Sequence, residues 1–373
     1  IAPHNDKVRS YLRDLEPVLE QKPDALIMSD PGLIMLVREK WPDQPIHLSV
    51  QANAVNWATV EFWRRQGISR VILSRELALN EIREIRDRVP EMELEVFVHG
   101  ALCMAYSGRC LLSGYMNHRD ANQGACTNAC RWNYKQVQHD HDQTGDLIAT
   151  CGGGDAQEVE PKEILLEEPN RPGGFIPAYE DEHGTYIMNS KDLRAVQHVA
   201  ELAKMGVHSL KIEGRTKSTY YVARTTQVYR RAIDEAMQGK PFDMSLMDEL
   251  EALSNRGYTE GFLRRHLPRE YQTYEQGSSF LGTQQVVGTI TDTDDQWLTI
   301  DVKNKFAPGD QLELINPAGN IRFSASIMEN RNGQTMDYAP GSGHIVRIPK
   351  PADLPQTLEH SYLTRILPSA HSN

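Results

Sequence analysis

Short apolar runs recur at nearly constant spacing along the first part of the chain. They begin at residues 24, 46, 70 and 94, and an amphipathic stretch with helical periodicity follows the earlier ones. Runs that are apolar at nearly every position are typical of strands buried on both faces. An interval of about 22 to 25 residues accommodates a strand, a helix and two loops. The pattern therefore predicts βα units and a parallel sheet.

Polar side chains stand where these runs end, among them Gln51, Arg75 and His99. In a (βα)₈ barrel the carboxyl ends of the strands converge on the active site, although strand ends also simply meet water. A fifth run covers 208–214, and the opening residues IAPHN look like the tail of an earlier strand. We expect an α/β fold, a TIM-like barrel that is N-terminally incomplete in this chain. A doubly wound sheet would give the same rhythm.

The alternation of apolar runs and amphipathic stretches is interrupted once, and in the last part of the chain a different pattern takes its place. A segment of about 101–184 is rich in Gly, Asn, Asp and His, which indicates an inserted, loop-rich region that carries the cysteines. From residue 278 onward, short alternating runs are separated by Gly, Asp and Pro turns, which predicts a small all-β barrel domain. The predicted organisation is a barrel domain over 1–239, a linker with a short helix over 240–277, and a β domain over 278–373. No internal repeat is evident.

One predicted helix has recognisable ends. The stretch SKDLRAVQHVAELAKMG has helical periodicity, with Ser190 or Asp192 as the expected N-cap and Gly206 as the stop. A strand and a second, longer helix that begins near Lys217 follow it. This order continues the βα alternation beyond the inserted region.

Charge and hydropathy exclude some classes of function. The net charge of −11 disfavours a general nucleic-acid binder, although a local basic surface is compatible with it. The apolar runs are much shorter than the roughly 20 residues that cross a bilayer. No basic segment followed by an apolar one opens the chain. We expect a cytoplasmic protein with no membrane contact.

Four of the five cysteines fall in one short window, and they are Cys103, Cys110, Cys126 and Cys130. An odd cysteine count without a secretion signal disfavours a disulfide framework. Clustered thiolates bind zinc, copper(I) or iron–sulfur clusters. Zinc sites usually contain C-x₂₋₄-C pairs, and the first two cysteines are spaced more widely than that, which favours a cluster. Zinc and buried structural cysteines are the alternatives.

The segment EVFVHGALCMAYSGRCLLS resembles the signature of the collagenase-like peptidase family U32. The matching residues are Glu95, Phe97, Gly100, Ala101, Leu102, Cys103, Gly108, Cys110 and Ser113. LSVQANAVN and SLKIEGRTKSTYYVARTTQVYRRAID are also typical of that family, and the resemblance extends over the whole chain. The opening strands of the family, SPAG and GADAVYAG, have no counterpart here.

The resemblance implies a TIM-like barrel with a cysteine-held [4Fe–4S] cluster at its mouth. Three segments are similar to a tRNA-modifying branch of the family: DALIMSDPGLIMLVRE, EDEHGTYIMNSKDLRA and RGYTEGFLRRH. That branch implies oxygen-independent hydroxylation of the wobble uridine of tRNA to 5-hydroxyuridine, with prephenate as the oxygen source. Peptidase activity is the alternative, although the sequence contains no HExxH or GxSxG motif. A non-catalytic RNA-binding or assembly factor is a third possibility.

For the cluster we predict four ligands, Cys103, Cys110, Cys126 and Cys130. Cys130 forms a C-x₃-C pair with Cys126, so both thiolates can reach one cluster from a single turn. Cys151 follows a polar run, and ordering that run would cost about 1–2 kcal/mol per residue. We therefore expect Cys151 to be a bystander.

A dicarboxylate such as prephenate requires fixed cations, and arginine matches a carboxylate with two parallel donors. The predicted substrate-binding residues are Arg75, Arg215, Lys217 and Gln51. His99 and Glu213 are candidates for proton transfer, since the pKa of histidine lies near neutrality. A purely structural pairing of Arg215 with Glu213 or Glu76 is the alternative.

Basic residues accompany aromatic ones in the long helix after residue 217 and in RGYTEGFLRRH. Such a combination suits phosphate contacts and base stacking, although a solvated helix face has the same composition. The predicted tRNA-binding residues are Arg224, Arg256, Arg264 and Arg265.

Overall fold

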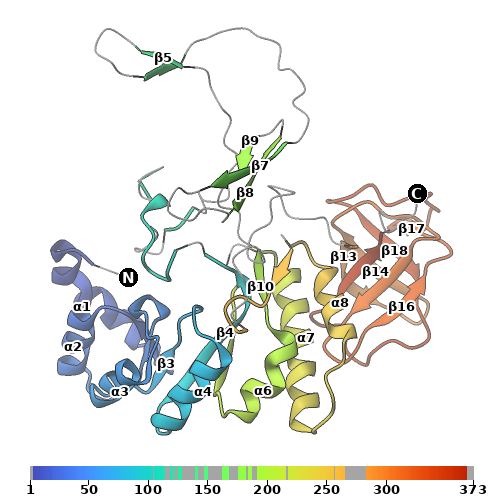
Figure 1. Cartoon of the computed structure of the whole chain (residues 1–373). Helices are drawn as coiled ribbons and strands as arrows, with labels where there is room; N and C mark the ends of the chain where they lie inside the picture. The colour runs from blue at the N-terminus through green and yellow to red at the C-terminus, as the bar shows by residue number, and fades with distance from the viewer. Residues whose placement is uncertain are drawn as a thin grey trace. The chain divides into compact units, whose positions relative to one another are not determined.

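The computed structural model divides the chain into two compact units (Figure 1). Unit 1 comprises residues 1–213 and 256–279, and unit 2 comprises 214–255 and 280–373. The structure describes residues 3–103, 105–113, 118–119, 121, 125–127, 191–215, 217–255, 257–264 and 283–367. Between them it gives only the backbone of five short strands: β5 (His139–His141), β6 (Leu147–Ala149), β7 (Lys162–Glu167), β8 (Phe175–Asp181) and β9 (Gly184–Tyr186).

Five of the seven described strands in the sheet of unit 1 run parallel to one another. They are β1 (Leu26–Met28), β2 (Ile46–Leu48), β3 (Arg70–Ile72), β4 (Glu93–Ala101) and β11 (Ser209–Ile212). Each pairs in parallel with the next, in the order of the chain. Each of the five coincides with a predicted apolar run, with β4 extending slightly beyond it, so the prediction of an α/β fold is confirmed. Among the described strands the sheet is open, with β1 at its edge.

Helices connect consecutive strands, and side-chain caps fix where some of them begin. After α1 (Asn5–Leu19), the chain forms α2 (Pro31–Lys40), α3 (Trp57–Arg65) and α4 (Leu79–Arg88). Asp30 accepts a hydrogen bond from the backbone N–H of Leu33, and Asn56 accepts one from Thr59, each at 2.9 Å. These caps satisfy backbone donors that have no partner within the helix. The Asp30 cap begins α2 shortly after the end of β1, and the Asn56 cap begins α3.

The two faces of this sheet differ in chemistry because successive side chains of a strand point to opposite sides. One face carries Leu48, Val71 and Leu94, all of them fully buried. On the other face, His47 of β2 is in register with Arg70 of β3, which is in register with Glu93 of β4. The parallel sheet therefore has one apolar face and one face that carries these charges beside the buried Ile72 and Phe97, which we call the ionic face.

The predicted helix that begins at Ser190 or Asp192 is shorter than expected. Asp192 opens a strand instead, β10 (Asp192–Arg194), which runs antiparallel to the end of β4 and parallel to β12 (Tyr258–Thr259). A 3₁₀ turn, η4 (Val196–His198), and α6 (Val199–Lys204) follow it. The predicted N-cap at Asp192 is wrong because hydrogen bonds with β4 and β12 outweigh local helix propensity. The stop at Gly206 is confirmed, with φ at 81°.

Unit 2 joins two helices to an antiparallel sheet. The helices are α7 (Thr219–Met237) and α8 (Ser245–Glu251). The strands are β13 (Gln284–Thr293), β14 (Trp297–Val302), β15 (Gln311–Ile315), β16 (Ile321–Ser324), β17 (Glu329–Asn330), β18 (Ile345–Pro349) and β19 (Tyr362–Ile366). Their order is β16-β15-β19-β13-β14-β18-β17. The prediction of an all-β C-terminal domain is confirmed.

Helix α7 is tied to the strands of unit 2 by side-chain hydrogen bonds. Gln227 donates to the backbone carbonyl of Asn316 at 2.8 Å, and the Tyr220 hydroxyl donates to Gln284 at 3.0 Å. Burial raises the pKa of Tyr220 to about 12. No helix among the described residues is both long enough and apolar enough to cross a membrane.

Candidate site at the cysteine-bearing loop

The segment that carries the cysteines leaves the sheet at the carboxyl end of β4. Here β4 is paired on both sides, with β11 and with β10. Gly100 has φ at 120°, and a Cβ at this position would lie 2.5 Å from the backbone oxygen of Glu213. Only glycine therefore allows the ends of β4 and β11 to approach so closely. The chain reaches Cys103 directly after this contact.

Residues 105–113, which we call the docked loop, pack against the turn that follows β2. The Ser107 carbonyl accepts a hydrogen bond from Asn53 Nδ2 at 2.7 Å. The Ser107 hydroxyl accepts one from Arg75 Nη1 at 3.3 Å. Gly108 lies so close to Gln51 that an added Cβ would be 2.7 Å from Gln51 Cβ. The predicted residue Gln51 therefore lies against the loop between Cys103 and Cys110.

A second set of contacts joins the far end of the docked loop to the segment with Cys126. Ser113 is buried, and its hydroxyl accepts a hydrogen bond from the backbone N–H of Thr127 at 3.1 Å. The hydroxyls of the two residues also lie 3.0 Å apart. These contacts hold Thr127, which follows Cys126, close to Ser113, which lies three positions after Cys110.

The predicted residues Arg75 and Glu213 form an ion pair at the same end of the sheet. The Arg75 side chain is 8% exposed and its guanidinium carbon lies 3.6 Å from the centre of the Phe97 ring. The Glu213 side chain is 43% exposed. Arg75 is therefore held in place from several sides, whereas the carboxylate that it binds is partly open to solvent.

His99 is buried near the end of β4. Its ring centre lies 5.4 Å from that of Tyr258, and its backbone oxygen accepts a hydrogen bond from the N–H of Glu213 at 2.9 Å. The backbone thus places His99 near the end of β4 beside Glu213, which directly follows β11; these are the two residues predicted to transfer protons.

Sequence reasoning missed a group of charges on the ionic face of the sheet. Glu95 is 7% exposed and accepts a hydrogen bond from Lys211 at 2.9 Å, while Arg70 lies 3.5 Å away. Burial alone would raise the pKa of Glu95, but the hydrogen bond and charge of Lys211 lower it below its ordinary value. Burial lowers the pKa of His47 on the same face, and the Arg70 charge adds to this effect. The sequence signal for this group was the presence of Arg70, Glu95 and Lys211 inside otherwise apolar runs.

Two predicted substrate-binding residues belong to the other unit. Arg215 is exposed, and Lys217 has its ammonium 4.9 Å from the centre of the Tyr221 ring; both are described within unit 2. Glu213 and Arg75 belong to unit 1. The structure shows Arg75 as an ionic partner of Glu213.

Three of the four predicted cluster ligands are described. Cys103 is exposed, Cys110 and Cys126 are half-buried, and none of the three forms a disulfide. Cys130 and the predicted bystander Cys151 lie outside the described residues. In the described part of the chain, no group of three or more His, Cys, Asp or Glu side chains is close enough to hold a metal ion. The chemistry of the thiols suits an iron–sulfur cluster, and the ligand set stays a prediction.

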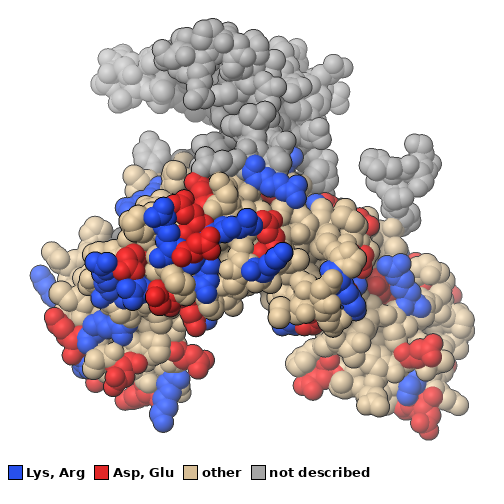
Figure 2. Space-filling view, turned by 60° about the horizontal axis from the view of Figure 1, so that its bottom comes forward, with Lys and Arg blue, Asp and Glu red and all other residues tan. Residues whose placement is uncertain are grey.

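The predicted tRNA-binding residues differ in exposure. Arg224 is 2% exposed and pairs with Glu249 at 3.0 Å inside unit 2, which argues against a phosphate contact. Arg264 is 57% exposed and lies 3.3 Å from Glu260. Arg256 and Arg265 lie outside the described residues. Basic and acidic side chains are interspersed on the face displayed in Figure 2.

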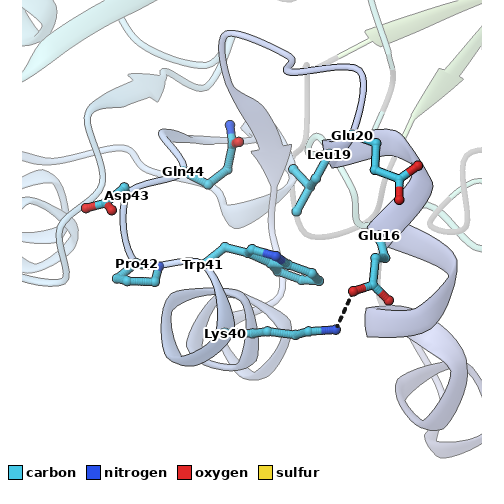
Figure 3. Close-up of a pocket in the computed structure, with 8 residues that line it drawn as sticks. All are labelled: Glu16, Leu19, Glu20, Lys40, Trp41, Pro42, Asp43 and Gln44. Carbon is cyan, nitrogen blue, oxygen red and sulfur yellow. Dashed lines mark hydrogen bonds and ion pairs between the residues drawn. The ribbon is translucent and has the colours of Figure 1, made fainter.

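A pocket of about 640 Å³ lies between the ends of α1 and α2 (Figure 3). Lys40 crosses it, with its ammonium 4.5 Å from the centre of the Trp41 ring and 3.3 Å from Glu16. The residues 41–44 that line it precede β2, so the pocket lies at the amino ends of the strands. The docked loop follows the carboxyl end of β4. The pocket is therefore separate from the candidate site.

Comparison with known proteins identifies matches along the whole chain. Residues 1–273 match peptidase family U32, and residues 282–365 match the C-terminal domain of that family. The chain is 61% identical to tRNA hydroxylation protein P of Escherichia coli, over 95% of this chain and 80% of that protein. It is 57% identical to the protein of the same name from Haemophilus influenzae, over 98% and 82%. A 23S rRNA 5-hydroxycytidine synthase of Escherichia coli is 26% identical, over 98% and 49%.

Proposed function

Because the chain belongs to peptidase family U32, and because relatives over most of its length are tRNA hydroxylation proteins, we propose that it is an enzyme that hydroxylates tRNA. The observation that carries this proposal is the 61% identity over 95% of the chain. The more distant relative named for 5-hydroxycytidine in ribosomal RNA supports nucleobase hydroxylation as the type of reaction.

In more detail, we propose that the product is 5-hydroxyuridine at the wobble position and that prephenate supplies the oxygen. We propose Cys103, Cys110, Cys126 and Cys130 as ligands of a [4Fe–4S] cluster. Three of them are described, and they lie on segments fixed by Asn53, Ser113 and Thr127. When bound, such a cluster supplies one-electron chemistry or a Lewis-acidic iron.

Arg75 is the residue proposed to bind a carboxylate of the substrate. Its guanidinium already binds the carboxylate of Glu213, and stacking on Phe97 fixes the plane of the group. A substrate carboxylate would take the place of the more exposed Glu213, which frees Glu213 to accept a proton. Lys217, Arg215 and Gln51 stay proposed as further substrate contacts, and His99 as a second group for proton transfer.

The tRNA surface is proposed to include Arg264, whose side chain reaches solvent. Arg256 and Arg265 are proposed from the sequence alone. A charge reversal at Arg264 should weaken tRNA binding in a salt-dependent manner, because phosphate contacts release counterions.

The test is expression in bacterial cells that lack their own tRNA hydroxylase. Nucleoside mass spectrometry of their tRNA should detect 5-hydroxyuridine with the wild-type chain and at least about tenfold less with Arg75→Ala. The matched control is Arg83→Ala, which removes an exposed arginine of the same unit that pairs with Glu201. Absence of the modified nucleoside with well-expressed wild-type protein, together with casein cleavage by that protein, would favour the peptidase alternative.

A further inference from the structure

We propose that Asn53 is a positioning residue that holds the docked loop, and with it Cys110, in the geometry that a cluster requires. The inference rests on the cluster proposed above, but its structural basis is independent of any bound group. Asn53 lies outside the cysteine-bearing segment, at the end of the 3₁₀ turn η1 (Val50–Ala52) that follows β2.

The backbone of Asn53 has an unusual conformation. Its φ and ψ are both 51°, in the left-handed region, which asparagine tolerates better than most residues with a side chain. Its N–H donates to the carbonyl of Val50 at 3.0 Å. The turn therefore ends at Asn53, and its side chain is directed at the docked loop.

Both ends of the Asn53 amide contact that loop. Nδ2 donates to the carbonyl of Ser107 at 2.7 Å, and Oδ1 accepts a hydrogen bond from Arg109 Nε at 3.0 Å. Ser107 and Arg109 flank Gly108, whose φ of 73° turns the chain at its closest approach to Gln51. A single amide thus clamps both sides of the turn that immediately precedes Cys110.

Only a neutral amide can make this pair of contacts, because one end must donate and the other must accept. Aspartate at this position could still accept from Arg109, but it would place a carboxylate oxygen against the Ser107 carbonyl. Glycine would keep the left-handed backbone and remove both contacts. Asn53→Gly therefore tests the loss of both hydrogen bonds without a change of backbone conformation, and Asn53→Asp tests the loss of the contact with the Ser107 carbonyl alone.

The thiol of Cys110 in iron-free protein reports on the loop without any cluster. Asn53→Gly should raise the rate of Cys110 alkylation by iodoacetamide, measured by mass spectrometry, about tenfold, because two hydrogen bonds no longer oppose opening of the loop. Alkylation of Cys126 should change less, since its neighbour Thr127 contacts Ser113, at the end of the docked loop that is farther along the chain from the Asn53 contacts. Asn53→Asp should give an intermediate rate for Cys110.

Iron and sulfide content after anaerobic reconstitution reports on positioning. We expect Asn53→Gly to retain less than about a third of the wild-type iron and to alter the electron paramagnetic resonance spectrum of the reduced protein. The matched control is Asn304→Ala, which removes one amide-to-carbonyl hydrogen bond in unit 2, from Nδ2 to Val286 at 2.8 Å. It should retain full iron content.

Three results would overturn the proposal. Unchanged alkylation of Cys110 in Asn53→Gly would show that the clamp does not hold the loop. Iron loss that merely follows a lowered melting temperature, with an unaltered spectrum, would indicate a structural role alone. If wild-type protein holds no iron, the proposed cluster is wrong, and so is the positioning role of Asn53. The alkylation rates would still show whether Asn53 docks the loop.

Discussion

The two units of the chain build their interiors in different ways. In unit 2, the core cluster consists of apolar side chains alone, among them Phe306, Leu312 and Ile348, all fully buried. In unit 1, one face of the parallel sheet buries Glu95 beside the partly exposed cations Lys211 and Arg70. The buried charges of unit 2, Glu313 and Arg224, are not members of this apolar cluster, whereas the parallel sheet of unit 1 places charge on a partly buried face.

This difference indicates how each unit is stabilised. An apolar core contributes in proportion to the area it removes from water, and it loses stability when a cavity is opened. A buried carboxylate is tolerated only while cations and hydrogen bonds compensate for its lost hydration. The charged face of the sheet in unit 1 should therefore respond to pH and to single charge deletions, and the apolar cluster of unit 2 to changes of volume.

The largest effect is expected from a cavity in unit 2. Phe306→Ala should lower the free energy of unfolding of that unit by about 3–5 kcal/mol, because the ring is fully buried in the core cluster. Hydrogen exchange followed by mass spectrometry would locate the loss to peptides of unit 2. Tyr338→Ala, which truncates an exposed ring, is the control and should change stability by less than about 0.5 kcal/mol. A loss of similar size in both variants would contradict the apolar-core account.

In unit 1 the corresponding experiment removes a charge. Glu95→Ala should cost about 2 kcal/mol, because it removes a buried carboxylate that accepts a hydrogen bond from Lys211 and pairs with Arg70, both of them partly exposed. The measurement is urea unfolding with exchange protection in β3 and β4 as the local readout. Glu91→Ala, at an exposed position nearby, should be nearly neutral. If Glu95→Ala were equally neutral, the ionic face would contribute little to stability.

The pH dependence of unit 1 should follow the same carboxylate. Because the pKa of Glu95 is lower in the folded state than its ordinary value of 4.5, the stabilisation is present above pH 4.5. It is lost as the pH falls below 4.5 and through the folded-state pKa. Urea unfolding between pH 3 and pH 6 should show a smaller change for Glu95→Gln than for the wild type. Identical pH profiles would argue against this assignment.

The smallest effect concerns a polar contact of unit 2. Tyr220→Phe removes the hydroxyl that donates to Gln284 while it keeps the buried ring, so it should cost about 1 kcal/mol. It should also remove the phenol whose pKa is raised to about 12, which is measurable by ultraviolet titration. A cost as large as that of Phe306→Ala would mean that polar contacts, rather than apolar volume, dominate unit 2.

Sequence periodicity does not reveal a device that the structure uses twice. Arg38 of α2 and Arg86 of α4 each reach beyond the end of their helix to backbone carbonyls four and six positions later. The acceptors are Pro42 and Gln44 for Arg38, and Pro90 and Met92 for Arg86. Each arginine also lies under a glycine that ends another helix, Gly67 and Gly206. The two regions share a short pattern, an arginine followed by a proline four positions later, which hydrophobic periodicity does not register.

The sequence by itself determined the five parallel strands, the all-β C-terminal domain and the family. Strand positions follow from local apolar periodicity, and family membership follows from motifs that surround Cys103 and Cys110. Only the tertiary structure decided that Arg75 pairs with Glu213, that Asp192 enters a strand and that Arg224 is buried. It also decided that Asn53 clamps a loop more than 50 residues away. These outcomes depend on long-range pairing, where a partner distant in the chain offers more stabilisation than the local preference of the residue.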